Sequence, residues 1–142
     1  MPSDLMLKSM NLVHKSLLKV SFGKVGWDAG GMPVLELTTT GRKSGQQRTV
    51  MLTSPVQDGD AIVIVASRGG DDHHPAWFLN LQANPTVQVV WKGEPKANMT
   101  ARVADEAERA RLWPLITTAY KNYAGYQAKT DREIPLVLLT RQ

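Results

Sequence analysis

The chain has 142 residues, of which 42% are hydrophobic and 21% are charged, as in one globular domain rather than a disordered or collagen-like chain. It contains no cysteine, which excludes disulfides, thiolate catalysis and cysteine-based zinc sites. The formal net charge of +4 indicates an anionic partner, and nucleic acid, acidic lipid and a phosphorylated cofactor all satisfy this condition.

Residues 1–27 are predicted to form an amphipathic helix and a glycine-rich connector ahead of a domain over residues 28–142. Apolar residues recur at spacings of three and four, as on one face of a helix: Met6, Met10, Val13, Leu17 and Val20. Polar residues interrupt this run, so neither a secretory signal nor a membrane span is expected. Two interpretations stay open. The helix packs on the domain, or it rests on an anionic membrane surface through Lys8, Lys15 and Lys19.

The remaining chain is predicted to be mainly strands with short connections. Strands are expected over residues 34–40, 48–57, 61–67, 86–92, 98–103 and 134–140. Pro55 indicates a bend or an edge in the second strand, and Asp58-Gly59 is typical of a hairpin. Helices are expected over residues 76–83, from Asp105, where Glu108 completes a capping-box pattern, and in a tyrosine-bearing segment that ends near residue 129.

Strands that follow one another through tight turns are antiparallel, and six of them close most readily into a barrel. The predicted strands and helices do not alternate along the chain, so a doubly wound sheet is disfavoured. The predicted fold class is therefore α+β, a six-stranded antiparallel barrel with an N-terminal helix and peripheral helices.

The segment 38–48 reads TTTGRKSGQQR and is the most informative part of the sequence. Gly41 and Gly45 allow a sharp turn that presents backbone N–H groups, and three cations and a hydroxyl lie close to Gly41. A dianionic phosphate needs such convergent donors and positive charge. The order of Lys43 and Gly45 is not that of a P-loop. The alternative is a solvated basic turn between two strands.

A second group of polar residues lies at the end of the buried strand, after residues 62–66. Ser67, Arg68 and two glycines come directly after it, and Trp77 and Asn80 share one face of the next helix. Taken alone, Trp77 is explained as a core aromatic residue and Asn80 as a surface amide. Together with the two cationic turns, they indicate a site for a planar cofactor.

Three tyrosines, Tyr120, Tyr123 and Tyr126, recur at a spacing of three and lie roughly on one side of a helix. Periodicity alone favours a partly buried packing stripe over a binding surface.

These motifs, in this order, resemble the deazaflavin-dependent nitroreductase family over about residues 28–140. The matching segments are 38–48, 66–70, 77–81 with Asn84-Pro85, and the three tyrosines. The resemblance implies a split β-barrel of the FMN-binding type. It also implies coenzyme F420, a 5-deazaflavin with a phosphate and an oligoglutamate tail, as the cofactor.

The resemblance also implies the site residues. Those on the phosphate side of the cofactor are Arg42, Lys43, Ser44, Gly45 and Arg48. Those around its ring are Val50, Met51, Leu52, Val65, Ala66, Ser67, Arg68, Trp77 and Asn80. The acceptor is expected to lie against Tyr120, Tyr123, Tyr126 and Trp77.

The activity implied by this resemblance is hydride transfer from reduced F420 to a hydrophobic, electron-poor acceptor. Quinones, enones, unsaturated lactones and nitroheterocycles fit an aromatic pocket with few polar contacts. The proton is expected from Tyr123, from Ser67 or from water. The resemblance also implies a monomer and an actinobacterial source. The absence of cysteine suits a reducing cytoplasm, and the alternative is membrane association at the inner face through the N-terminal helix.

Three rival interpretations are weaker. An FMN-dependent oxidase or reductase on the same barrel would use the same phosphate turns. A nucleic-acid-binding barrel is disfavoured because the aromatic residues do not alternate with the cations. No metal site is expected, since Asp71, Asp72, His73 and His74 are adjacent in one loop and read as a solvated segment.

Overall fold

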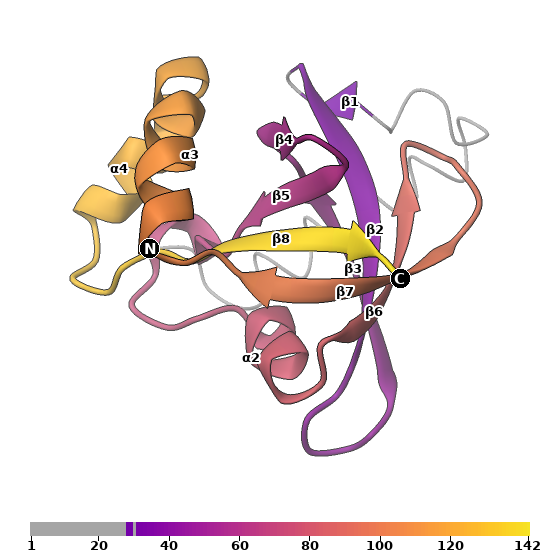
Figure 1. The fold of residues 1–142 in the computed structure, drawn as a ribbon. Coiled ribbons are helices and arrows are strands. Elements are labelled where there is room, and N and C mark those ends of the chain that lie inside the picture. Colours follow the sequence, from indigo (N-terminus) through magenta and orange to yellow (C-terminus); the bar gives the residue numbers. More distant parts are fainter. Residues whose placement is uncertain (1–27, 30) are drawn as a thin grey trace.

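The computed structural model describes residues 28–29 and 31–142, so the predicted helix and connector over residues 1–27 lie outside the described residues. In this part of the chain, strands form one sheet and the helices pack around it, which gives an α+β fold (Figure 1). The strands are β1 (Asp28–Ala29), β2 (Met32–Thr40), β3 (Gln47–Thr53), β4 (Val56–Asp58), β5 (Ala61–Val65), β6 (Thr86–Trp91), β7 (Ala97–Val103) and β8 (Leu136–Arg141). The helices are α2 (Ala76–Ala83), α3 (Glu106–Ala119) and α4 (Asn122–Ala128), and the 3-10 turn η2 (Arg68–Gly70) follows β5.

The sheet is antiparallel throughout and curls into a half-barrel (Figure 1). Its strand order is β1-β2-β6-β7-β8-β5-β4, and β3 also pairs with β2. Only Ser54 and Pro55 separate β3 from β4, which pairs with β5 at the far end of this order. One bent segment therefore connects the two ends of the sheet.

Ser54 holds this bend in place. Its side chain is fully buried, and its hydroxyl donates to the carbonyl of Val63 at 2.6 Å and lies 2.9 Å from the carbonyl of Val56. Its N–H donates to the carbonyl of Pro33 at 3.0 Å. These partners belong to β5, β4 and β2, so one buried residue links three strands around the curl.

The predicted number of six strands is corrected to eight for the described residues. The bend at Pro55 divides the predicted strand over residues 48–57 into β3 and β4, because proline has no N–H to continue a ladder. The two-residue strand β1 had no signal in the sequence. The predicted hairpin forms: Asp58 pairs with Ala61, and Gly59 takes a φ of 61° in the turn.

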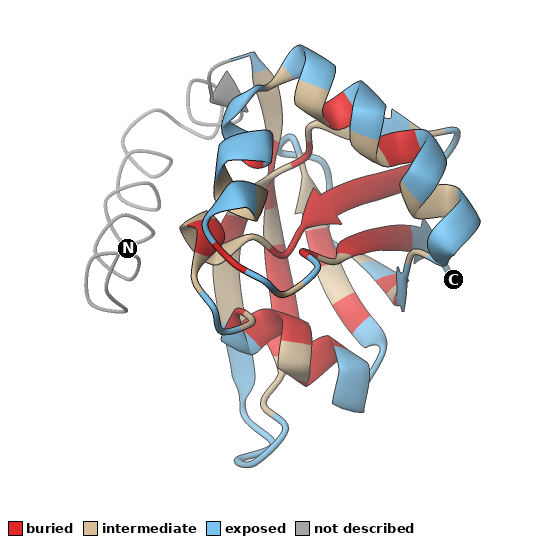
Figure 2. Ribbon diagram, turned by 90° about the vertical axis from the view of Figure 1, so that its left-hand side faces the viewer, coloured by how far each residue is buried: buried red, intermediate tan, exposed pale blue. Residues whose placement is uncertain are grey.

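The sheet buries apolar side chains on both faces, and buried residues gather on its strands and on α2 (Figure 2). The inner cluster lines the inside of the curl and contains Ile62 and Ile64 of β5 and Phe78 of α2. The outer cluster contains Val63 and lies beneath α3 and α4. Successive residues of β5 thus face opposite clusters, which explains its unbroken apolar sequence. No helix in the described part of the chain is long and apolar enough to cross a membrane.

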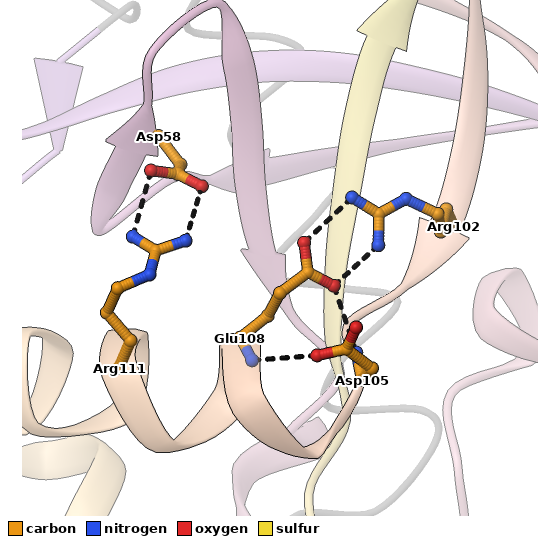
Figure 3. Close-up of polar contacts among 5 residues, drawn as sticks. All are labelled: Asp58, Arg102, Asp105, Glu108 and Arg111. Carbon is orange, nitrogen blue, oxygen red and sulfur yellow. Dashed lines mark hydrogen bonds and ion pairs between the residues drawn. The ribbon is translucent and has the colours of Figure 1, made fainter.

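Two arginine–carboxylate pairs attach α3 to the sheet (Figure 3). Arg111 of α3 donates to both carboxylate oxygens of Asp58 in β4, at 3.0 and 2.8 Å. Arg102 of β7 donates to both oxygens of Glu108, at 2.5 and 2.8 Å. The predicted capping box is confirmed, because Asp105 accepts from the Glu108 N–H and Glu108 accepts from the Asp105 N–H. The Arg102 guanidinium and the Asp105 N–H together lower the pKa of Glu108 from 4.5 to about 2.

Replacing Glu108 with Gln is expected to lower the free energy of unfolding by about 1 kcal/mol at neutral pH, the usual scale for a cap and an exposed ion pair. Because the native-state pKa lies below the unfolded one, the stabilisation by Glu108 is present above pH 4.5 and is lost as the pH falls towards 2. The difference between wild type and E108Q should therefore shrink over that range in urea unfolding. E106Q, an exposed neighbour in the same helical turn, is the control, and a pH-independent difference for E108Q would contradict the assignment.

Candidate cofactor site

The loop between β2 and β3, residues 41–46, carries the cations that the sequence singled out. The Gly41 N–H donates to the Gln46 carbonyl at 2.7 Å, and the Gly45 N–H donates to the Gly41 carbonyl at 2.9 Å. Gly45 has a φ of 72°, and a Cβ at Gly41 would lie 2.7 Å from the Ser44 Oγ and 3.2 Å from the Gln46 carbonyl oxygen. Glycine at these two positions lets the loop close tightly on itself.

The charged side chains of this hairpin point away from the protein interior. Arg42, Lys43 and Arg48 are exposed, and none forms an ion pair with a carboxylate among residues 28–29 and 31–142. The Ser44 Oγ accepts from the Gln46 N–H at 3.1 Å, so its own proton is not used in that bond. The hairpin therefore presents positive charge and a hydroxyl donor to an anion from outside.

Asn80 lies behind this loop and not on an open surface. Its side chain is 5% exposed, and its Oδ1 accepts from the Arg42 N–H at 3.1 Å and from the Arg42 Nη1 at 3.4 Å. Its Nδ2 donates to the Thr39 Oγ1 at 3.2 Å. Both ends of the amide are thus engaged with the β2–β3 hairpin, and Asn80 acts here by positioning Arg42.

The turn after β5 has an unusual backbone. Arg68, Gly69 and Gly70 have successive φ values of 47°, 65° and 84°, all in the left-handed region. For a residue with a side chain, such as Arg68, this conformation costs roughly 1–2 kcal/mol. A Cβ at Gly70 would lie 2.7 Å from the carbonyl oxygen of Tyr126, so the turn packs directly against α4.

The two predicted site residues at this turn differ in their contacts. Ser67 is half-buried, and its hydroxyl has no hydrogen-bond partner in the described part of the chain. Arg68 forms an ion pair with Asp71 at 3.1 Å, with both side chains largely buried. Ser67 is therefore available to a ligand, whereas Arg68 already has a carboxylate partner.

Arg132, which the sequence did not single out, is a central polar contact of this region. From the loop before β8, its guanidinium donates to the carbonyl oxygens of Ala66 at 3.2 Å, Ser67 at 2.8 Å and Asp71 at 2.8 Å. Its Nη1 also lies 3.2 Å from the Nδ1 of His74. Burial, with the neighbouring Arg132 charge, lowers the pKa of His74, which favours a neutral imidazole that accepts this bond. A lone arginine in a polar loop has no periodicity or motif that would mark it in advance.

The three tyrosines lie over the outer cluster. Tyr123 is 6% exposed, and its hydroxyl lies 3.5 Å from the Thr53 Oγ1 and 3.6 Å from the Met32 Sδ. Burial raises the pKa of Tyr123 above its usual value of 10. Tyr120 and Tyr126 are half-buried, and the Tyr126 ring meets that of Tyr123 edge to face at 5.9 Å. Tyr123 thus serves in packing, and its two neighbours keep exposed surface.

The remaining predicted residues fall on both faces of the sheet. Val50 and Leu52 are half-buried against the inner cluster, to which Ala66 and Trp77 also belong. Val65 belongs to the outer cluster, and Met51 is buried on the face of β3 opposite Val50. Trp77 is only 8% exposed, so its role in this structure is that of a core aromatic residue.

His74 connects the two groups of site residues. Its ring lies 4.8 Å from that of Phe78 in α2, the helix that carries Asn80, and its Nδ1 meets Arg132. The loop from residue 71 to 74 has no arrangement typical of a metal ligand set among the described residues, and the Asp71 carboxylate binds Arg68 and the His73 N–H.

Comparison with known proteins identifies the family. Residues 12–141 match the family model described as F420H(2)-dependent quinone reductase. An F420H(2)-dependent quinone reductase of Mycobacterium tuberculosis is 40% identical over 134 residues, which cover 92% of this chain and 89% of that protein. A putative member from Mycobacterium bovis matches to the same extent.

Solved structures agree with this result. An F420-H2 dependent reductase is 44% identical, with a TM-score of 0.66 over 75% of this chain and 93% of that one. A chain described as a domain-swapped dimer is 38% identical, with a TM-score of 0.68 over 92% and 98% of the two chains. The haem storage protein HutZ of Vibrio cholerae, at 12% identity and a TM-score of 0.59, shares the fold alone.

The resemblance to deazaflavin-dependent reductases is thereby confirmed, together with coenzyme F420 as the cofactor. The chain belongs to the F420H(2)-dependent quinone reductase family and is an F420-dependent oxidoreductase.

Proposed function

We propose that this chain reduces quinones with a hydride from F420H2, and that the β2–β3 hairpin holds the phosphate side of the cofactor. The observation that carries the proposal is the positive charge of Arg42, Lys43 and Arg48, in a chain of this family. These side chains are exposed and have no ion pair with a carboxylate among the described residues.

The residues present fit the cofactor. Its phosphate and glutamates are anionic, and the hairpin offers three exposed cations and the Ser44 hydroxyl. The half-buried Val50 and Leu52 offer an apolar edge on the adjoining strand β3. On the other side, the ring would meet the backbone from Val65 to the turn at η2, where the Ser67 hydroxyl is uncommitted within the described residues.

The bound cofactor supplies a hydride, and the reduction of a quinone to a hydroquinone takes one further proton. Ser67 is the better placed of the two proposed proton donors, because its hydroxyl has no partner in the described part of the chain and it is half-buried rather than enclosed. Tyr123 keeps its proton at neutral pH, but packing surrounds it. The half-buried Tyr120 and Tyr126 supply aromatic surface for a flat acceptor.

The proposal also includes the oligomeric state of the protein and its contact with a membrane. The monomer expected from the family resemblance stands against a similar chain described as a domain-swapped dimer, so dimerisation is the alternative to be measured by gel filtration. Contact between residues 1–27 and a membrane stays a prediction, which binding to anionic vesicles tests.

The function is tested by titrating the purified protein with F420 and with FMN, followed by fluorescence, and then by following F420H2 oxidation with a soluble quinone. Binding of F420 with weak FMN binding, together with quinone-dependent turnover, is the expected result. A preference for FMN would overturn the cofactor. Turnover with enones or nitroheterocycles but not with quinones would overturn the acceptor class.

Replacing Asn80 with Ala is expected to weaken F420 binding about tenfold, because the Arg42 N–H and guanidinium lose a buried acceptor that is worth 1 kcal/mol or more. The measurement is the dissociation constant, taken well below the melting temperature of the variant. Asn84→Ala removes a similar amide just beyond α2, whose Oδ1 accepts from the Thr86 N–H, and it is the control. Wild-type affinity in N80A would show that Asn80 does not position the hairpin.

Replacing Ser67 with Ala is expected to lower kcat by about a hundredfold or more with saturating quinone, the scale of a lost general acid. Tyr123→Phe should leave kcat nearly unchanged and reduce stability slightly, because its hydroxyl makes only long contacts with Thr53 and Met32. Steady-state kinetics at several pH values separate the two. The reverse result, a large loss in Y123F and none in S67A, would make Tyr123 the donor.

A further inference from the structure

We propose that Arg132 is a positioning residue for the reductase reaction, because its guanidinium holds the left-handed turn after β5 in the conformation that offers Ser67 to the cofactor. The expected effect on the reductase reaction rests on the proposed function, whereas the hydrogen bonds of Arg132 to the turn do not depend on it.

The bonds of Arg132 lie on both sides of the turn. Ala66 and Ser67 precede the left-handed residues and Asp71 follows them, and the carbonyl of each accepts from the same guanidinium. One planar guanidinium therefore fixes the distance between the Ala66 carbonyl and the Asp71 carbonyl. A guanidinium suits this arrangement because its five N–H donors point in fixed directions.

The turn needs such support because its own backbone does not favour it. Arg68 takes a φ of 47° without the freedom of glycine, and two further left-handed residues follow it. A conformation of this kind persists only where the surroundings determine it. Within the turn, the Gly70 N–H donates to the Ser67 carbonyl at 2.9 Å, and that carbonyl oxygen also accepts from Arg132.

Arg132 is itself held in place by α4. The Gln127 Nε2 donates to the Arg132 carbonyl at 2.7 Å, and the Gln127 Oε1 accepts from the Ile134 N–H at 2.9 Å. Arg109 of α3 reaches the same Gln127 Oε1 at 3.3 Å. The loop before β8 is thus anchored to the helices, and Arg132 extends from this anchored loop to the turn.

The burial of the Arg132 side chain is consistent with a structural role for its charge. The Arg132 side chain is half-buried, it donates to carbonyls and to neutral His74, and burial lowers its pKa. No carboxylate forms an ion pair with it in the described part of the chain, so its attraction is directed at backbone oxygens. A lysine would keep the charge but could not span three carbonyls in one plane.

The first measurement is amide hydrogen exchange of the cofactor-free protein in wild type, R132K and R132A. Exchange over residues 66–71 should become faster in both variants, with the strands of the sheet unchanged. R111A is the matched control, since Arg111 also makes a pair of hydrogen bonds, to Asp58, but contacts neither the turn nor α4 through them. Unchanged exchange over residues 66–71 in R132K would overturn the proposal even if R132A does not fold.

The second measurement is the affinity for F420 together with kcat and KM for a soluble quinone. R132A should bind F420 about tenfold more weakly, as expected for loss of charge-assisted hydrogen bonds, and R132K should lose less. Low concentrations of guanidinium should restore part of the affinity of R132A, whereas methylammonium at equal ionic strength should not. Affinity and kcat equal to those of wild type in R132K and R132A would overturn the positioning role. Failure of wild type to bind F420 would instead overturn the proposed function, and the exchange result would still decide whether Arg132 holds the turn.

Discussion

The bend at Ser54 and Pro55 is the constraint on which the rest of this structure depends. It connects β3, which pairs with β2, to β4, which pairs with β5, and the buried Ser54 hydroxyl and N–H bond to three different strands. The sheet must therefore curl. A curled sheet has an inside that side chains can fill and an outside that helices can cover, and β5 is buried on both sides.

The curl of the sheet also connects the two parts of the site to one core. The cationic hairpin and the turn after β5 are far apart in sequence, and the structure connects each to the core through one buried or half-buried polar side chain. Asn80 holds Arg42 and Thr39 from α2, and Arg132 holds the turn from the loop before β8. His74 touches both Arg132 and α2. Because buried polar groups need their partners, these contacts define a single arrangement of the site.

The exposed and the enclosed residues of the site have different uses. Arg42, Lys43 and Arg48 are exposed and form no ion pair with a carboxylate in the described part of the chain, and the Ser67 hydroxyl has no hydrogen-bond partner there, as is typical of ligand-binding groups. Asn80, Trp77 and Tyr123, which the family resemblance also placed at the cofactor or the acceptor, are less than 9% exposed and act through packing or through neighbours. Their substitution should consequently change stability or loop position before it changes chemistry.

The sequence by itself determined the features that depend on residues close together in the chain. The capping box at Asp105 and Glu108, the hairpin at Gly59, the glycines of the cationic loop and the break at Pro55 follow from local backbone preferences, and the order of the motifs was enough to identify the family. Only the tertiary structure decided the strand count, the burial of Trp77, Asn80 and Tyr123, and the part played by Arg132. Those contacts join residues far apart in the chain: Asn80 and Arg42 are 38 positions apart, Arg132 and Ala66 are 66, and Tyr123 and Thr53 are 70. A side chain whose partners come from distant segments leaves no periodic or local signal, and its role exists only when the sheet has curled.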